Sequence, residues 1–153
     1  MSYVDNVLQP GERVVVRATI HWVTYLAGLL ALIAAAAVWL AGLNASSGVK
    51  LVTGTVALLL AAVGLYALIR AWLRRWGTEI AVTDRRVIYK SGVISRRTIE
   101  MNMQQIESVD VDQTLFGRIL DYGDIGVHGT GGDVDPFRLI AHPLAIRTAI
   151  TAR

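Results

Sequence analysis

The amino-acid sequence predicts an α+β protein in which an N-terminal two-helix transmembrane hairpin precedes a small antiparallel β domain capped by a C-terminal helix. Two long runs without a charged residue predict the hairpin. After Gly77 the apolar runs give way to short alternating segments separated by turn residues, which predicts about six or seven strands. The last segment starts at His142-Pro143 and predicts a helix, because proline suits a first helical turn.

The first apolar run covers residues 22–43 and contains 22 residues without a charge. A helix of that length is roughly 33 Å long at about 1.5 Å per residue, which is enough to cross the hydrocarbon core of a bilayer. A secretory signal peptide is the alternative interpretation. A transmembrane helix is favoured, because residues 1–21 precede the run, a second span follows it, and it is longer than the apolar part of a typical signal peptide.

The second apolar run contains 19 residues without a charge, from Leu51 to Ile69, and predicts a transmembrane helix over residues 51–72. Only residues 44–50 separate the two runs, which predicts antiparallel neighbours joined by a short extracytoplasmic turn. That turn holds a single basic residue, Lys50, whereas the outer flanks hold Arg13, Arg17, Arg70, Arg74 and Arg75. The positive-inside rule therefore predicts a two-pass protein of the cell inner (plasma) membrane with both termini cytoplasmic.

Alanines recur every four residues along both runs, and glycines add further small surfaces. The alanines are Ala27, Ala31 and Ala35 in the first run and Ala57 and Ala61 in the second, and the glycines are Gly28, Gly54 and Gly64. Such stripes allow helices to approach closely. Contact within the hairpin is the favoured interpretation, and a dedicated face for a second copy is the alternative. No ionisable residue lies in the middle of either run, which argues against an ion or proton path within one copy.

The cytoplasmic domain is expected over residues 77–153. Its strands are expected at residues 78–83, 85–92, 96–101, 106–114, 124–129 and 137–140. Residues 115–123 predict a short helical turn or a bulged connection, and residues 130–133 predict a turn. The terminal helix should present an apolar face made of Leu144, Ala145, Ile146, Ala149 and Ile150. This order of elements describes a small antiparallel sandwich or a partly open barrel capped by a helix.

Residues 1–21 form a cytoplasmic lead-in that carries the β-rich run 14–20. This run predicts an edge strand on the same sheet, because both flanks of the hairpin emerge on the cytoplasmic side. A frayed interfacial segment is the alternative.

Motifs and composition argue against an enzyme and against a metal or cofactor site. The chain has no cysteine, and its three histidines, His21, His128 and His142, are widely separated. The nucleophile-elbow, P-loop and zinc-protease motifs are missing from the sequence. The segment HGTGGD, residues 128–133, faintly resembles a phosphate loop, but it falls between two expected strands, so a hairpin turn is favoured.

Acidic residues collect in the second half of the chain. Residues 77–153 carry nine basic against ten acidic residues, so the net charge of +3 does not arise from the folded domain and no nucleic-acid partner is expected. Solvated strand faces are favoured over a cation site for its aspartates, because the EF-hand spacing is missing. These aspartates are Asp110, Asp112, Asp121, Asp124, Asp133 and Asp135.

Basic residues concentrate next to the second apolar run. Residues 70–97 carry eight basic against two acidic residues, whereas residues 98–135 carry one basic against eight acidic. A leaflet rich in anionic lipid attracts juxtamembrane Lys and Arg by about 1 kcal/mol each. The candidate lipid-binding residues are Arg74, Arg75, Arg85, Arg86, Lys90, Arg96 and Arg97. The alternative is that they set membrane topology and solvate a strand face.

Several motifs together resemble a known family. They are Thr83-Asp84-Arg85-Arg86-Val87, Gly92-Val93-Ile94 with Arg96 and Arg97, the segment IESVDVDQT (106–114), Phe116-Gly117-Arg118-Ile119-Leu120, Tyr122-Gly123, Ile125 and Val127. With the lead-in LQPGERVVVRATIHW before a helical hairpin, they resemble the bacterial pleckstrin-homology-like (PH-like) domain of membrane-anchored proteins. The resemblance implies a split β-barrel with a C-terminal helix and frequent oligomerisation, and it implies no activity, because members of this family mostly lack an assigned chemistry.

We therefore expect a non-catalytic inner-membrane protein whose cytoplasmic PH-like domain is a binding and assembly module. Its expected partners are anionic lipid headgroups, contacted through the basic segment, and further copies of the chain or another membrane protein. The alternative is an accessory subunit of a larger membrane complex, such as a transport or membrane-stress system, contacted through the transmembrane hairpin.

Overall fold

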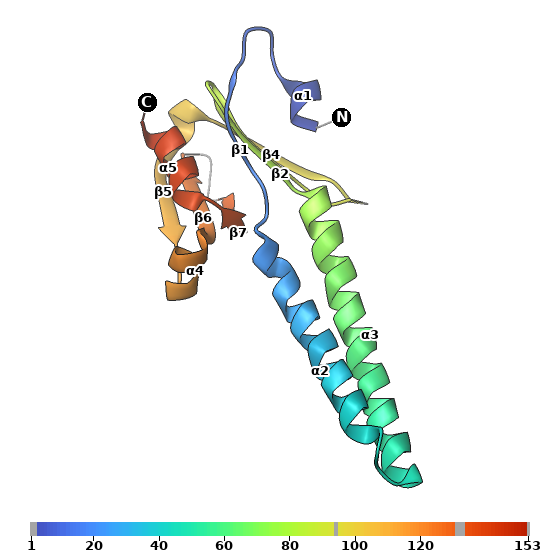
Figure 1. Cartoon of the computed structure of the whole chain (residues 1–153). Helices are drawn as coiled ribbons and strands as arrows, with labels where there is room; N and C mark the ends of the chain where they lie inside the picture. The colour runs from blue at the N-terminus through green and yellow to red at the C-terminus, as the bar shows by residue number, and fades with distance from the viewer. Residues whose placement is uncertain (1–2, 94, 131–133, 153) are drawn as a thin grey trace. The chain divides into compact units, whose positions relative to one another are not determined.

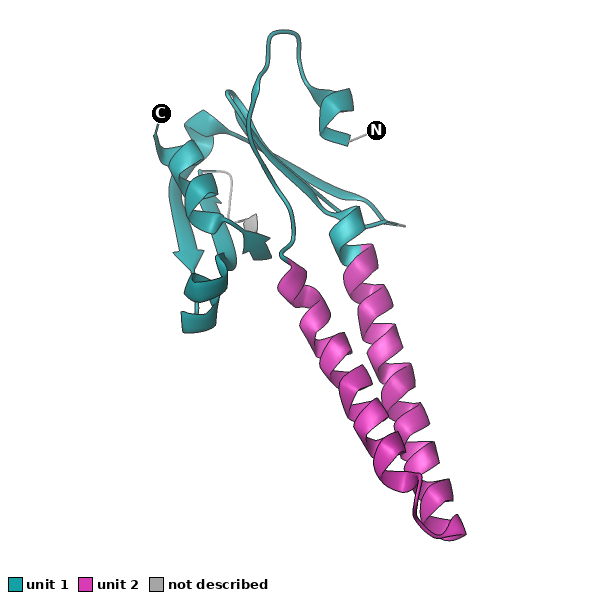
Figure 2. Cartoon of the chain, in the orientation of Figure 1, with its two compact units in different colours: residues 1–21, 74–153 teal, residues 22–73 magenta. Residues whose placement is uncertain are grey.

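The chain divides into two compact units (Figure 2). Residues 22–73 form a helical unit, and residues 1–21 together with residues 74–153 form a sheet unit. The computed structural model describes residues 3–93, 95–130 and 134–152, apart from the side chains of residues 134–136. The sheet unit therefore combines the residues that precede the helical unit in the sequence with those that follow it.

The helical unit is an antiparallel pair of helices (Figure 1). A 3-10 turn, η1 (Trp22–Tyr25), leads into α2 (Leu26–Gly42), and α3 (Ser47–Gly77) returns. The continuous helical segment Trp22–Gly42, which is η1 together with α2, and helix α3 are both long and apolar enough to cross a membrane, by length and composition. Helix α3 extends beyond the expected residues 51–72 at both ends. It passes through Arg74 and Arg75 because arginine is a good helix former and no glycine or proline follows until Gly77.

Glycines bring the two helices of this unit together at two levels. A Cβ atom added to Gly28 would lie 2.7 Å from Cγ of Leu68 and 3.0 Å from the backbone oxygen of Gly64. A Cβ atom on Gly42 would clash with the side chain of Thr53, 2.1 Å from its Oγ1. The small residues therefore make the close contact within the hairpin that the sequence predicted.

The residues of the sheet unit that the structure describes form seven strands in two antiparallel sheets. Figure 1 shows both sheets. The first sheet has the order β1-β2-β3-β4 and the second has the order β5-β6-β7. Their bounds are β1 Val14–Ala18, β2 Glu79–Thr83, β3 Arg86–Ser91, β4 Arg97–Asn102, β5 Ile106–Asp112, β6 Tyr122–Gly129 and β7 Val134–Ala141. The strand number agrees with the prediction, and the described strands form two open sheets rather than a closed barrel.

Strand β1 is the expected edge strand. It lies at the edge of the first sheet and pairs antiparallel with β2, so that Ala18 lies opposite Ile80. It ends before residue 20, where the sequence predicted its end, because the chain then leaves the first sheet.

The crossing segment, residues 19–21, joins the two sheets. Ile20 forms an isolated bridge with Ile140 of β7, and both side chains are at most 2% exposed. Two backbone hydrogen bonds flank the bridge: the Ala141 N–H donates to the Thr19 carbonyl at 3.0 Å, and the His21 N–H donates to the Leu139 carbonyl at 2.7 Å. The lead-in therefore pairs with both sheets.

The apolar core lies between the sheets and under the terminal helix, α5 (Pro143–Thr151). Strand residues of both sheets contribute, and α5 adds Ile146 and Ile150. The apolar face of α5 is narrower than predicted, because Leu144 is 52% exposed and Ala145 is also exposed. The side chains at positions 146 and 150 are one turn apart on one helix face, and this is the face that meets the core.

Among its described residues, the sheet unit also contains the short elements α1 (Tyr3–Val7), η2 (Met103–Gln105) and α4 (Leu115–Leu120). Helix α4 is the short helical turn expected over residues 115–123, and β6 follows from Tyr122, earlier than residue 124. Helix α1 was not predicted from the sequence. Residues 131–133, where a turn was predicted, lie outside the described residues.

The core position of Ile140 gives a test of this packing. Replacing Ile140 by Ala should lower the free energy of unfolding by about 2–5 kcal/mol, because it removes buried methyl groups where the two sheets meet. The measurement is chemical unfolding of the full chain in mild detergent, followed by circular dichroism. Leu144→Ala is the matched control, since that side chain is largely exposed. Equal losses for the two variants would contradict the assigned core.

Candidate functional site

The first sheet separates the seven candidate lipid-binding residues into two groups. Strands β2 and β3 pair with Glu79 opposite Lys90, at the end of the hairpin away from its turn. Arg85 and Arg86 lie at the turn, and Arg86 is about 13 Å from Lys90 for four residues at about 3.3 Å each. The remaining group lies near the end of α3 and is called here the helix-end group: Arg74, Arg75, Lys90, Arg96 and Arg97.

Arg86 belongs to an internal network. Its Nε and Nη2 donate to the two carboxylate oxygens of Glu12, each at 3.0 Å, and its Nη1 donates to Oε2 of Glu100 at 2.7 Å. Nη2 also donates to the carbonyl of Val7 at 2.8 Å. The Glu12 side chain is 0% exposed and that of Arg86 is 12% exposed. The Arg86 guanidinium therefore binds the lead-in to β3. The sequence predicted that Arg86 would be available to lipid, but its side chain is largely buried.

A tight turn before β1 presents Glu12 to this network. Gly11 has a φ of 81°, which suits the third position of a type II turn, and the Glu12 N–H donates to the Gln9 carbonyl at 2.9 Å. The Glu12 carboxylate also accepts from the Gln9 N–H at 2.8 Å and from the Thr83 hydroxyl at 2.7 Å. The carboxylate is thus bound by four groups from three parts of the chain.

These contacts set the ionisation of the pair. Burial alone would raise the pKa of Glu12, but the hydrogen bonds from the Gln9 N–H, Arg86 and Thr83 outweigh burial and lower the pKa to about 2. The hydrogen bond with Glu12 in turn raises the pKa of Arg86. Sequence reasoning missed the pair because its members are 74 positions apart. The one signal for it was an acidic residue placed directly after Pro10-Gly11.

Two glycines bring the β3–β4 turn against the end of α3. A Cβ atom on Gly77 would lie 2.7 Å from Cγ2 of Val93. Gly92 has a φ of 93°, and a Cβ atom there would lie 1.9 Å from the carbonyl oxygen of Ser95. Glycine is therefore required at position 92 for the turn to close and at position 77 for the helix end to meet it.

A cavity of about 300 Å³ lies at this contact and is lined by Trp76, Gly77, Glu79, Lys90, Gly92, Val93 and Arg96. The Lys90 Nζ lies 3.3 Å from Oε1 of Glu79 and 5.2 Å from the centre of the Tyr3 ring. Its side chain is only 14% exposed, so much of its charge is balanced within the chain. Arg96 is exposed at the same cavity and supplies positive charge toward solvent.

The other cations of the helix-end group are also exposed. Arg74 and Arg75 lie in the last turn of α3, and Arg97 begins β4 opposite Ser91. Arg85 is exposed at the far end of the hairpin, where its Nη1 contacts Oε1 of Gln9 at 3.4 Å. The structure therefore brings Arg74, Arg75, Arg96 and Arg97 to one end of the first sheet as exposed cations.

Within the described ranges, no three His, Asp or Glu side chains are grouped as a metal site requires. Asp110 contacts Nε2 of His128 at 3.1 Å, and Oδ1 of Asp124 accepts from the Leu139 N–H at 2.7 Å. Gly131, Gly132 and Asp133, which belong to the HGTGGD segment and the aspartate set, lie outside the described residues, as does the side chain of Asp135.

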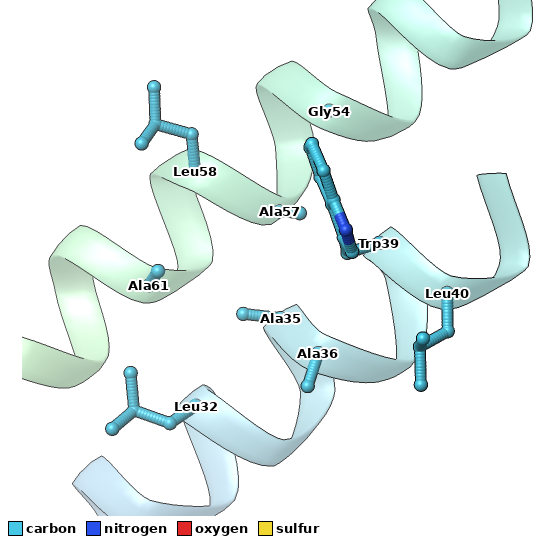
Figure 3. Close-up of a pocket in the computed structure, with 9 residues that line it drawn as sticks. All are labelled: Leu32, Ala35, Ala36, Trp39, Leu40, Gly54, Ala57, Leu58 and Ala61. Carbon is cyan, nitrogen blue, oxygen red and sulfur yellow. The ribbon is translucent and has the colours of Figure 1, made fainter. Parts of the chain in front are cut away.

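The helical unit carries an apolar groove of about 460 Å³ between its two helices (Figure 3). Small residues of both helices form its floor, and the indole ring of Trp39 crosses toward α3 beside Gly54 and Ala57 (Figure 3). The larger side chains of Leu40 and Leu58 stand at its margins and are 63% and 69% exposed. The groove suits an apolar group, because its lining is made of leucine, alanine, glycine and tryptophan.

In the described part of the sheet unit, two antiparallel sheets of four and three strands are followed by a C-terminal helix, which is the order of elements expected of a PH-like domain. The chain belongs to the bacterial PH domain family, since the family model described as Bacterial PH domain matches residues 15–153. The match runs from β1 through both long helices to the end of the chain, and it confirms the resemblance seen in the sequence. Comparisons with curated proteins and with solved structures gave no match.

The pKa of Glu12 predicts how stability depends on pH. Its folded-state pKa of about 2 lies below the ordinary value of 4.5, so the unfolded chain binds more protons and stability should fall as pH is lowered from about 4.5 to 2. The loss should be on the order of 3 kcal/mol, at 1.36 kcal/mol per pKa unit. The measurement is chemical unfolding of the full chain in detergent across this range.

A matched pair of variants identifies the residue responsible. Glu12→Gln should flatten the pH dependence and reduce stability at neutral pH, because Arg86 loses its buried partner. Asp5→Asn removes an exposed ion pair with Arg17 and should change stability by less than about 1 kcal/mol. An unchanged acid transition in Glu12→Gln would show that another group carries it.

Proposed function

We propose that this chain is a non-catalytic two-pass protein of the inner membrane with both termini cytoplasmic. The observation that carries the proposal is the outward-facing apolar surface of the helical unit. Leu51, Leu58 and Leu40 are 74%, 69% and 63% exposed, and the segments Trp22–Gly42 and Ser47–Gly77 are both long enough to span. A soluble protein rarely exposes a continuous apolar surface of this kind, whereas lipid covers it without cost.

The residues at the helix ends support the proposed orientation. Trp22 precedes α2, and Trp72 and Trp76 lie in the last turns of α3, where aromatic rings favour the membrane interface. Lys50 lies in the first turns of α3, at the other end of the hairpin. The cations Arg74 and Arg75 thus mark the cytoplasmic end, on the side of the sheet unit.

The helix-end group is the part of the PH-like domain that docks on anionic lipid. Arg74, Arg75, Arg96 and Arg97 are exposed and lie next to the last turn of the second span. Each cation near an anionic leaflet contributes about 1 kcal/mol within a Debye length. Arg85 and Arg86 contribute less in this proposal, because they lie at the far end of the hairpin and Arg86 is held by Glu12.

The domain also assembles with further copies of the chain. Strand β5 is an edge of the second sheet, and it exposes Glu107, Asp110 and Asp112. The helix-end group provides cations elsewhere on the same unit. Opposite charges on separate surfaces suit head-to-tail contacts between copies.

A second candidate function uses the hairpin instead. The apolar groove of the helical unit (Figure 3) has a floor of alanine and glycine, which allows the backbone of another helix to approach closely. In this alternative the chain is an accessory subunit of a larger membrane complex, such as a transport or membrane-stress system, and the groove receives a helix of that partner.

Charge reversal at the helix-end group tests the docking proposal. Arg96→Glu combined with Arg97→Glu should reduce the preference for phosphatidylglycerol over phosphatidylcholine by roughly thirtyfold, which corresponds to about 2 kcal/mol. The readout is the number of each lipid retained per full chain in native mass spectrometry from mixed micelles. Arg85→Glu is the control and should have a much smaller effect. If lipid preference is unchanged, these arginines only set topology.

Assembly is tested by the mass of the full chain in mild detergent. Light scattering should give more than one chain per particle at low salt and a single chain near 1 M salt, because the Debye length shrinks from about 10 Å at 0.1 M to about 3 Å. Monomers at every salt concentration would remove the assembly part of the proposal.

The accessory-subunit alternative is tested by moving the sheet unit to an unrelated membrane anchor. Partner binding that is retained after this change would argue against the alternative, because the hairpin would then not be needed for the contact.

A further inference from the structure

Helix α4 presents three large apolar side chains to solvent. Leu115, Phe116 and Ile119 are 77%, 72% and 78% exposed, more than Trp76 of the same unit at 66%. Leu115 and Ile119 are four positions apart and Phe116 and Ile119 are three apart, so the three side chains share one side of the helix. These three side chains do not belong to the apolar core, and they are separate from the helix-end group.

The exposed side chains are held by a rigid support. The Gly117 N–H donates to the Thr114 hydroxyl at 3.0 Å, which caps the helix, and Nε2 of Gln113 donates to the Tyr122 carbonyl at 3.0 Å. Gly117 itself is buried, and a Cβ atom there would lie 2.6 Å from the Tyr122 carbonyl oxygen. The inner side of α4 is therefore fixed against β6, and its apolar side is presented in one orientation.

Helix α4 ends beside the point where the chain leaves the sheet unit. The His21 ring stacks on the Tyr122 ring with centroids 5.3 Å apart, and the backbone of Leu120 forms a hydrogen bond with the His21 side chain. His21 directly precedes Trp22, where the first apolar helix begins. If that helix spans the bilayer, His21 lies at the cytoplasmic interface, and the residues at the end of α4 are in contact with it.

We propose that α4 inserts Leu115, Phe116 and Ile119 into the cytoplasmic leaflet of the membrane that anchors the chain. The inference rests on the proposed anchoring. Arg118 is the single basic residue between residues 98 and 135, and it lies on α4 itself, where its charge suits lipid phosphate. This combination of apolar and cationic side chains on one short helix is typical of an interfacial element.

Carboxylates near α4 do not prevent its insertion, but they reduce the attraction of this region to anionic lipid. Asp121 is paired with His142, and Asp124 accepts a hydrogen bond from the Leu139 N–H, so both are engaged within the chain. Asp112 is exposed at the end of β5. Attraction to anionic lipid is therefore weak around α4, and insertion depends on the apolar side chains. It should be insensitive to salt, unlike docking through the helix-end arginines.

The absence of cysteine from the chain allows the depth of single positions to be measured. The full chain carrying Ile119→Cys with an environment-sensitive fluorophore is reconstituted in vesicles of phosphatidylcholine and phosphatidylglycerol. Gln104→Cys is the matched control, because it is exposed at the opposite end of β5, roughly 23 Å away over seven residues at about 3.3 Å each. Leu58→Cys reports on the middle of α3.

The proposal expects nitroxide-labelled lipid to quench the fluorophore at position 119 several-fold more than at position 104, with little change between 0.1 and 1 M salt. Phe116→Ser in the Ile119→Cys chain should weaken that quenching. Equal aqueous exposure at positions 119 and 104 would overturn the proposal, and so would protection at 119 from both lipid and aqueous quenchers, which indicates contact with a second copy. Loss of lipid quenching at position 58 would instead refute the anchoring itself.

Discussion

The crossing segment, residues 19–21, is the constraint on which the sheet unit depends. It leaves the first sheet after β1, places Ile20 in the core against Ile140, and hydrogen-bonds on both sides to β7. The residues after the helical unit therefore lack a complete domain of their own, because the lead-in supplies the edge of one sheet and a link to the other. The whole helical unit is the connection between β1 and β2. Antiparallel pairing of α2 and α3 brings the two ends of that connection together, which reduces the entropy cost of closing it.

The Glu12–Arg86 pair also joins the lead-in to the rest of the sheet unit. It changes how many of the basic residues can be counted as available charge. A guanidinium that donates three hydrogen bonds to two carboxylates is already neutralised, so Arg86 adds little to the potential outside the domain. Lys90 is engaged in the same way by Glu79 and Tyr3. A count of basic residues along the sequence therefore overstates the charge available to a membrane. Arg74, Arg75, Arg96 and Arg97 are exposed near the end of α3, and they come from two segments of the chain.

Features with a local periodic signal were predicted well from the sequence. The two apolar helices, the strands after Gly77, the edge strand near Val14 and the helix at Pro143 each follow from a repeat or a turn signal within about ten residues. The missed features are pairings between distant residues. Glu12 and Arg86 are separated by the whole helical unit, and nothing near either residue indicates the partner. The exposure of Phe116 was missed for a similar reason, since an apolar residue in a short helix is normally assigned to the core until the packing on its other side is known.

Tethering explains why weak contacts would be sufficient for the proposed docking. Under the proposed anchoring, the sheet unit is joined to the membrane at His21 and again at Arg74, so its local concentration at the bilayer surface is fixed by the chain. The tether has then already removed most of the translational freedom that association would cost. A few kcal/mol from arginines or from α4 would therefore select an orientation of the sheet unit and would not provide its attachment. The two contributions respond to different conditions, because screening weakens charge attraction over a Debye length of about 8 Å at physiological ionic strength but leaves apolar insertion unchanged. Under the two proposals, the lipid composition of the leaflet would therefore change the arginine contact and leave the α4 contact unchanged, while the helical unit provides the attachment.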